Sequence, residues 1–204
     1  MIGEIIVRIK NFFIAIFIAF MNITATWAED ARINFAITIP EFLNIQTVTS
    51  PVLIANITDD TGNLYTPLSS RFKVISNSEE QKTLYLKAES NTENGAEPAM
   101  FQMGGRVYIA FANVNKPPKT DALINCKNGT HPKFSPGVVA YPITSITGTK
   151  TKYQRGKENY EVYIKNGETN IAVNIGSHIL RNSFDKNDPK GFYQATLSLT
   201  ESDI

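Results

Sequence analysis

Apolar and polar residues alternate strictly along one short stretch near the start of the chain. Between residues 33 and 39 every second position carries a large apolar side chain, namely Ile33, Phe35, Ile37 and Ile39. Successive side chains of a β-strand point to opposite faces, so this pattern predicts a strand with one wholly apolar face. Pro40 ends it, because proline has no amide hydrogen to donate to a ladder. The strand's partner is either the chain's own sheet or that of another molecule.

Similar patterns recur further along the chain and predict eight or so short strands in all. The clearest lie at residues 52–58, 71–76, 82–88, 106–113, 159–165, 169–175 and 191–200, with a shorter one near 138–141. In the last strand, Tyr193, Ala195, Leu197 and Leu199 form the apolar face. Beyond residue 28 no segment keeps an apolar period of 3.6 residues. The sequence therefore predicts an all-β fold, a sandwich with Greek-key connections.

The links between these strands contain recognisable turn signals. The polar residues 77–81 predict a hairpin between the strands at 71–76 and 82–88. Asn166-Gly167 predicts a second, two-residue hairpin between 159–165 and 169–175. Residues 89–98 are polar and are expected to form a loop. Residues 116–142 contain five prolines, which predicts a long connection with one short strand.

The first 28 residues have the layout of a secretory signal. Arg8 and Lys10 precede an apolar run of about ten residues, which is shorter than the roughly 20 that a membrane span requires. Small residues flank Trp27 in Thr26-Trp27-Ala28, as a signal peptidase requires. We expect residues 1–28 to be removed on export; an uncleaved N-terminal membrane helix is the alternative.

Charge and cysteine content narrow the functional classes. Of 20 basic and 19 acidic residues, only Glu4, Arg8 and Lys10 precede residue 29, so the rest of the chain carries equal numbers of each sign. No basic cluster is present to attract a phosphate backbone, and nucleic acid is not an expected partner. Cys126 is the only cysteine, so no disulfide can form within the chain.

The sequence offers little support for catalysis or metal binding. His131 and His178 lie far apart without a second ligand nearby, whereas a zinc site needs three or four converging ligands. The segment 185–191 has oxygen ligands and a glycine but lacks the distal Glu of a calcium loop, so an ordinary loop is expected. The tyrosines could form a stacking surface for sugars, although packing within strands is the stronger expectation. We expect no enzyme activity, no metal and no cofactor.

Both ends of the chain beyond residue 28 resemble chaperone–usher pilins of the colonisation-factor (alpha) type. The end, Gly191-Phe192-Tyr193 followed by alternating aliphatic residues, is similar to the closing strand of those pilins. The start, residues 33–39, Pro40 and then Leu43-Asn44-Ile45, resembles their opening. The segments at 72–75 and 84–86 are similar to that branch's second quarter. Asn44 stands where the family usually has Asp, and residues 116–142 have no counterpart. Spore-coat-like secreted β-sandwiches share the closing strand.

The resemblance implies an immunoglobulin-like Greek-key β-sandwich that lacks one strand and is completed by a donated one. Residues 29–40 would form the donor-type strand and residues 41–204 the pilin-like domain, with the proline-rich stretch near 116–142 as an insertion. The donor side chains would be Ile33, Phe35, Ile37 and Ile39, each filling one pocket of a neighbouring subunit. The implied partners are copies of the chain or related subunits, a periplasmic chaperone and an outer-membrane usher, with a host glycan or protein as a further candidate. The implied location is a fimbria on the cell surface.

Two other interpretations stay open on the sequence alone. In the first, the chain is a self-contained secreted β-sandwich that binds a glycan or protein through exposed tyrosines or residues 116–142. The segment 33–39 would then pair within its own sheet. In the second, the chain is a hydrolase with dispersed catalytic residues.

Overall fold

The structure is a computed structural model. It describes residues 36–48, 67–119, 134–176, 178–181, 183–184 and 186–202, together with the backbone of 52–57. By its contacts the chain divides into two units, Met1–Ile39 and Pro40–Ile204. All regular structure in the described residues belongs to the second unit. The expected signal sequence, residues 1–28, lies outside the described part.

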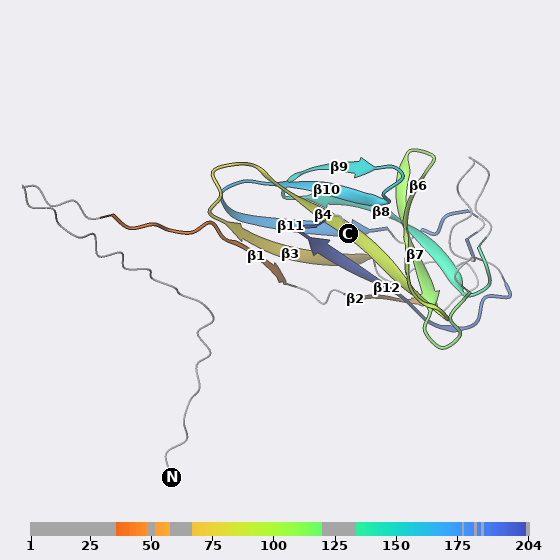
Figure 1. Cartoon of the computed structure of the whole chain (residues 1–204). Coiled ribbons are helices and arrows are strands. Elements are labelled where there is room, and N and C mark those ends of the chain that lie inside the picture. Colours follow the sequence, from red (N-terminus) through yellow and green to blue (C-terminus); the bar gives the residue numbers. More distant parts are fainter. Residues whose placement is uncertain are drawn as a thin grey trace, which may run out of the picture. The chain divides into compact units, whose positions relative to one another are not determined.

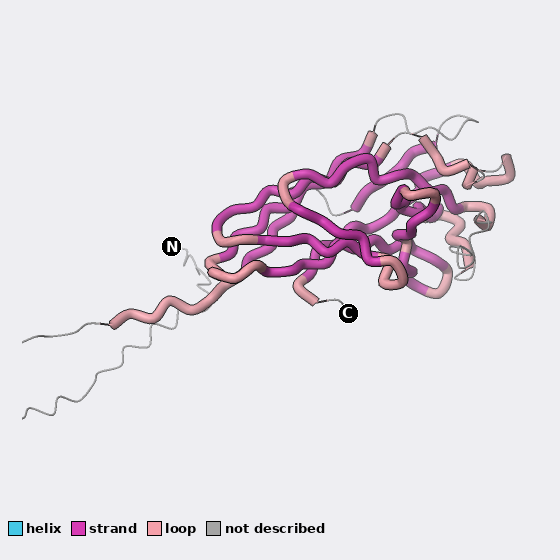
Figure 2. Tube along the Cα trace, turned by 90° about the horizontal axis from the view of Figure 1, so that it is seen from above, coloured by secondary structure: helices cyan, strands magenta, loops and turns pink. Residues whose placement is uncertain are grey.

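The second unit is built from strands, which Figures 1 and 2 show. In chain order they are β1 (Leu43–Thr47), β2 (Val52–Ile57), β3 (Leu68–Ser76), β4 (Lys82–Thr92), β5 (Gly95–Pro98), β6 (Met100–Met103), β7 (Arg106–Asn113), β8 (Val138–Thr147), β9 (Lys150–Gln154), β10 (Asn159–Ile164), β11 (Gly167–Ile175) and β12 (Gly191–Thr200). The described residues include no helix, and therefore none that could cross a membrane. The expectation of an all-β, sandwich-like fold is confirmed.

One sheet consists of β1, β3, β11 and the second half of β8, in that order and antiparallel throughout. Strands from the two ends of the domain are therefore neighbours. This interleaving is the A-B-E-D order of one sheet in an immunoglobulin-type sandwich. The longest ladder, between β3 and β11, runs from Leu68–Ile175 to Ser76–Gly167.

The other sheet is organised around β12 and β4. On one side β12 pairs with β2, and on the other side with β4 and, over two residues, with β7. Beyond β4 follow β10 and β9, while β5 extends β4 as a hairpin and β6 extends β7. The neighbouring pair β12–β4 corresponds to the F and C strands of the immunoglobulin-type arrangement.

Strand β8 belongs to both sheets. Its first half pairs with β7, ending at Pro142 opposite Tyr108, and its second half pairs with β11 from Ile143 onward. Proline lacks a ladder donor, so it suits the point where the strand leaves one partner for the next. The carbonyl oxygen of Pro142 accepts a hydrogen bond of 2.9 Å from the amide of Gly176.

The core lies between the two sheets and follows the alternation read from the sequence. Phe72 and Val74 of β3 face inward, as do Leu84 and Leu86 of β4, and all four are buried. The apolar face predicted for β12 is buried along its whole length. In β7 both faces are buried from Val107 to Asn113, which one-sided alternation does not predict.

Both predicted hairpins are wrong, although their strands exist. β3 pairs with β1 and β11, whereas β4 pairs with β12, β10 and β5. Likewise β10 lies in the sheet of β4, and β11 in the sheet of β3. Each short link therefore crosses from one sheet to the other. The strands that it joins face each other across the core instead of sharing a ladder.

Two other predictions need correction or extension, and two strands were not predicted. The expected loop at residues 89–98 instead continues β4 to Thr92 and returns as β5, with the Thr92 hydroxyl donating to the carbonyl of Gly95. The strand near 138–141 extends to Thr147. β6 and β9 were not predicted, because each is only four or five residues long and β9 is mostly polar. The part of the proline-rich stretch at 120–133 lies outside the described residues, as does Cys126.

Candidate strand-pairing site

The two described members of the apolar N-terminal segment are Ile37 and Ile39. Their side chains are 91% and 77% exposed, and residues 36–39 belong to no strand. Ile33 and Phe35 lie outside the described residues. An isolated exposed apolar residue is ordinary, but the sequence places these two on one side of a strongly alternating stretch.

The chain enters the sandwich at Pro40–Phe42. The side chain of Asn77 forms hydrogen bonds with this segment at two points. The amide of Phe42 donates to Oδ1 of Asn77 at 2.7 Å, and Nδ2 of Asn77 donates to the carbonyl oxygen of Pro40 at 2.9 Å. The backbone amide of Asn77 also donates to the carbonyl oxygen of Phe42, at 3.4 Å. These bonds extend the β1–β3 ladder one position past its last pair, Leu43 and Ser76.

An exposed ion pair joins the same segment to the start of β4. Nζ of Lys82 lies 2.6 Å from Oε1 of Glu41. Hydrogen bonds from Lys82 and then from Ser78 lower the pKa of the Glu41 carboxyl, and the hydrogen bond to Glu41 raises the pKa of Lys82. Exposed pairs contribute little stability, so this contact mainly restricts the position of Glu41.

The strand at one edge of the sandwich is split into two parts: β1 belongs to one sheet and β2 to the other. β1 pairs with β3 over Phe72–Ser76, and after residues 48–51 the chain continues as β2, which pairs with β12 over Gly191–Thr196. Along the rest of β3 and the rest of β12, this edge has no partner strand among the described residues. On β12 that part is Leu197–Thr200, and we call it the open edge.

The open edge has an apolar inner side. Leu197 and Leu199 point into the core, where they are 0% and 7% exposed. Leu43 and Ile45 of β1, the edge strand of the other sheet on this side, are only partly buried. The part of β3 that precedes its described ladder with β1 is more polar, since Leu68 there is followed by Ser69 and Ser70. A strand with an apolar face is therefore better matched to β12 than to β3.

The described part of the segment 185–191, which was considered as a calcium loop, has a structural role. Oδ1 of Asp188 accepts a hydrogen bond of 2.6 Å from the amide of Gly137. The carbonyl of Pro189 accepts bonds from the hydroxyl of Tyr193 at 2.6 Å and from Nδ2 of Asn113 at 3.2 Å. These bonds tie the start of β12 to the connection before β8. Within the described ranges no three potential ligands converge as a metal site would require.

Most of the tyrosines considered for sugar stacking are part of the core. Tyr108, Tyr141 and Tyr193 are buried. Tyr153 and Tyr160 pack against the core and meet each other edge to face, with ring centroids 5.1 Å apart. Burial raises the pKa of both Tyr153 and Tyr160, and the Tyr153 hydroxyl also donates to the Glu158 carboxylate. Tyr163 lies on the outer face of β10, where its hydroxyl donates to Glu161 at 2.5 Å.

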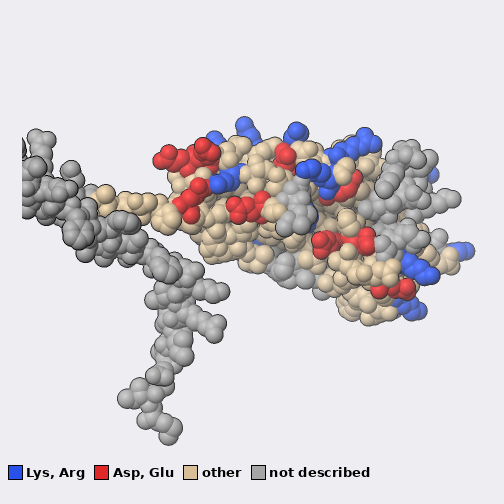
Figure 3. Space-filling view, viewed as in Figure 1, with Lys and Arg blue, Asp and Glu red and all other residues tan. Residues whose placement is uncertain are grey.

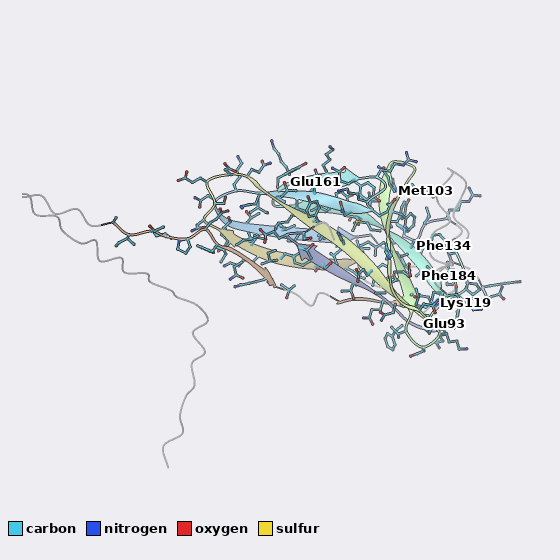
Figure 4. The ribbon with its side chains drawn as sticks, viewed as in Figure 1. Glu93, Met103, Lys119, Phe134, Glu161 and Phe184 are labelled. Atoms are coloured by element: carbon cyan, nitrogen blue, oxygen red, sulfur yellow. The ribbon has the colours of Figure 1, made fainter. Side chains whose placement is uncertain are left out.

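Figure 4 labels three apolar side chains toward one end of the sandwich, Met103, Phe134 and Phe184. All three are partly buried against the core, and the ring of Phe134 lies 6.0 Å from that of Phe101. Acidic and basic side chains are interspersed on the face in Figure 3. His178 is exposed, and His131 lies outside the described residues.

No protein-family model matches the chain, and a search of curated proteins finds no match.

Proposed function

We propose that the chain is a structural, non-enzymatic subunit of a surface fibre of the fimbrial type. In this proposal residues 33–39 of one copy pair with the open edge of the next, as the resemblance to chaperone–usher pilins implies. The donor side chains are Ile33, Phe35, Ile37 and Ile39. Export of the chain and its delivery by a periplasmic chaperone and an outer-membrane usher belong to the same proposal.

One observation carries this proposal. The same chain contains an alternating apolar segment and a strand edge with an apolar inner side that no described strand covers. Ile37 and Ile39 are exposed, and Leu197–Thr200 have β4 on one side without a described strand on the other. Unpaired apolar edges promote aggregation, which is a physical reason for a chaperone to cover such an edge before assembly.

The length of the open edge limits the free energy that a donated strand gains by burying its apolar side chains. Four residues provide room for two inward-pointing side chains, half the number in the donor segment. At roughly 1.5–3 kcal/mol for each fully buried side chain, two give about 3–6 kcal/mol before ordering costs. Burial of all four requires β2 to separate from β12, so the exchange we propose includes replacement of β2 pairs such as Val52–Thr196.

The test is the oligomeric state of residues 29–204, purified without a chaperone and compared with a variant carrying Ile37→Ser and Ile39→Ser. We expect polymers from the parent chain and monomers from the variant. Val48→Ser is the matched control, because Val48 is an exposed apolar residue outside the donor segment and should not affect polymerisation. A parent chain that remains monomeric at all concentrations would contradict the proposal.

The closed core favours a second candidate, a self-contained secreted binding module. Leu197 and Leu199 are buried although no strand of the described residues covers the open edge. A monomer that binds a glycan or protein would account for this without strand exchange. Residues 36–39 belong to no strand, contrary to the pairing within its own sheet that this interpretation expected. Loss of residues 29–39 would therefore leave the ligand binding of such a module unchanged, whereas a fibre subunit would lose assembly.

A further inference from the structure

The hairpin formed by β9 and β10, residues 150–165, carries a local excess of positive charge. Five of its residues are basic and two are acidic, although the chain beyond residue 28 contains equal numbers of each sign. All five basic residues are exposed, namely Lys150, Lys152, Arg155, Lys157 and Lys165. In Figure 3, basic side chains line the margin of the second unit near the place where Figure 1 draws β9 and β10. The expectation that the chain has no basic cluster does not hold here.

Both carboxylates of the hairpin accept hydrogen bonds from tyrosine hydroxyls. Tyr163 donates to Oε2 of Glu161 at 2.5 Å, and Tyr153 donates to Glu158. The hydrogen bond from Tyr163 lowers the pKa of the Glu161 carboxyl, and neighbouring lysines act in the same direction. Glu161 is therefore ionised at neutral pH, and its side chain is held in a defined position among the basic residues.

The strand register places several of these groups on one face of the sheet. Lys150 lies opposite Tyr163 and Lys152 lies opposite Glu161, while Tyr85 of β4 lies opposite Glu161 on its other side. Directly opposite residues of an antiparallel pair share a face. The two tyrosines and Glu161 are partly exposed, and Figure 4 labels Glu161. We call these five residues the β9–β10 patch.

The turn between β9 and β10 has a defined backbone. The amides of Lys157 and Glu158 both donate to the carbonyl oxygen of Gln154, at 3.3 and 3.0 Å. Gly156 and Glu158 adopt the left-handed conformation, with φ +92° and +53°. That conformation is uncommon for a residue other than glycine. The turn therefore presents Arg155 and Lys157 from a fixed loop beside the patch.

Protection of a sheet edge accounts for only part of this arrangement. β9 pairs with β10 alone among the described strands, and exposed lysines on an edge strand discourage association with other edges. That role explains Lys150 and Lys152. It does not explain the basic residues of the turn or the ionised Glu161 between tyrosines on the outer face. The combination matches a ligand that offers anionic groups to the basic residues and hydroxyl groups to the carboxylate.

We propose that the β9–β10 patch and its turn bind an acidic polysaccharide, a sugar polymer that carries carboxylate or sulfate groups. The basic side chains contact the anionic groups, Glu161 accepts hydrogen bonds from sugar hydroxyls, and Tyr85 and Tyr163 supply ring surface. The backbone of DNA offers the same kind of anion but no hydroxyl to donate to Glu161. This inference goes beyond the proposed function and does not depend on strand donation.

The test is the binding of residues 29–204 to four polymers, namely dextran sulfate, polygalacturonate, uncharged dextran and oligodeoxythymidine. Isothermal titration gives the Kd for each. We expect binding to at least one of the two acidic polysaccharides, which separates sulfate from carboxylate recognition, weaker binding to oligodeoxythymidine and none to dextran. Affinity should fall as salt is added, because the Debye length shortens from about 10 Å at 0.1 M to about 3 Å at 1 M.

Two pairs of substitutions locate the binding site. Lys152→Ser with Lys157→Ser should raise the Kd of the bound polysaccharide about 2- to 30-fold, since each exposed ionic contact corresponds to a roughly 1.4- to 5-fold change. The control is Lys119→Ser with Lys186→Ser, which removes the same charge from exposed positions outside the hairpin and should leave the Kd unchanged. Both pairs are also measured in the chain with Ile37→Ser and Ile39→Ser, so that assembly does not affect the comparison.

A further pair of variants tests the tyrosine ring. Tyr163→Ala should weaken binding, whereas Tyr163→Phe keeps the ring and should weaken it less. Urea unfolding shows that each variant is folded, and Tyr163→Phe against the parent chain still reports on Glu161 if Tyr163→Ala is not.

Several results would overturn the inference. These are no binding to either acidic polysaccharide, an equal loss of binding in the hairpin and control pairs, and tighter binding of oligodeoxythymidine than of both polysaccharides. The last would make the hairpin a nucleic-acid surface. A chain that stays monomeric but binds an acidic polysaccharide through the hairpin would contradict the proposed function alone.

Discussion

Thr196 of β12 lies opposite Val52 of β2, and this pair is the last on that side of β12 within the described strands. On its other side, Thr196 lies opposite Glu89 of β4, and that ladder continues to Thr200. The two sides of β12 therefore end at different residues. The difference defines the open edge.

Amide exchange should reveal this asymmetry directly. In an antiparallel strand, successive amides point to opposite sides, so alternate amides between Leu197 and Thr200 face the open edge. We expect those amides to exchange quickly in the monomer, while their neighbours, bonded to β4, stay protected. Amides at 192–196, with partners on both sides, should all be protected. Uniform protection from 192 to 200 would mean that another strand covers the edge.

Among the glycines in the described connections, Gly148 should be the least replaceable. It has φ +95°, and a Cβ atom there would lie 1.7 Å from the carbonyl oxygen of Asn170. Gly156 has nearly the same backbone, φ +92°, but no atom within 4 Å of its Cβ position. We expect Gly156→Ala to cost about 1–2 kcal/mol for the left-handed backbone. Gly148→Ala should cost about 1–3 kcal/mol more because of the clash. Urea unfolding measures both, and equal costs would contradict this close approach.

Tyr193 should make the stability of the domain fall in alkaline solution. Burial raises its pKa to about 12, from an ordinary value of 10. The folded state therefore holds the proton more tightly than the unfolded chain. The resulting stability is complete below pH 10 and is lost as the pH rises from 10 to about 12. Tyr193→Phe should remove this contribution to the pH dependence.

The same variant also loses the hydrogen bond to Pro189, at a cost of about 1 kcal/mol at pH 7. The control Tyr85→Phe removes a hydroxyl from the outer face of β4 and should change the unfolding free energy by less than about 0.5 kcal/mol. Unfolding curves at pH 7 and 11 make the comparison. An unchanged pH dependence in Tyr193→Phe would contradict the effect assigned to burial.

The alternation of residues was sufficient to find most strands and their inward faces. Burial of Leu84, Leu86, Leu197 and Leu199 follows from a period of two, because each strand buries one face. Pairing does not follow in the same way. A polar link such as residues 77–81 fits a hairpin and a crossing between sheets equally well. The choice depends on partners far away in the sequence, such as Ser76 with Gly167.

The candidate site was only partly predictable. The alternating residues 33–39 stand out in the sequence, but the division of the edge into β1 and β2 depends on where each half finds its partner. The role of Asn77 gives no sequence signal at all, since asparagine in a polar link predicts only a turn. Its two bonds to Pro40 and Phe42 bring together residues more than thirty positions apart.

The most direct test of strand donation uses a chain that lacks residues 29–39 and a peptide of residues 29–40. We expect the peptide to bind and to protect the exposed amides between Leu197 and Thr200, whereas a peptide with Ile37→Ser and Ile39→Ser does not. Binding without protection of these amides, or no binding by a correctly folded domain, would contradict the account. So would residues 33–39 of an intact monomer hydrogen-bonded on both sides within their own sheet.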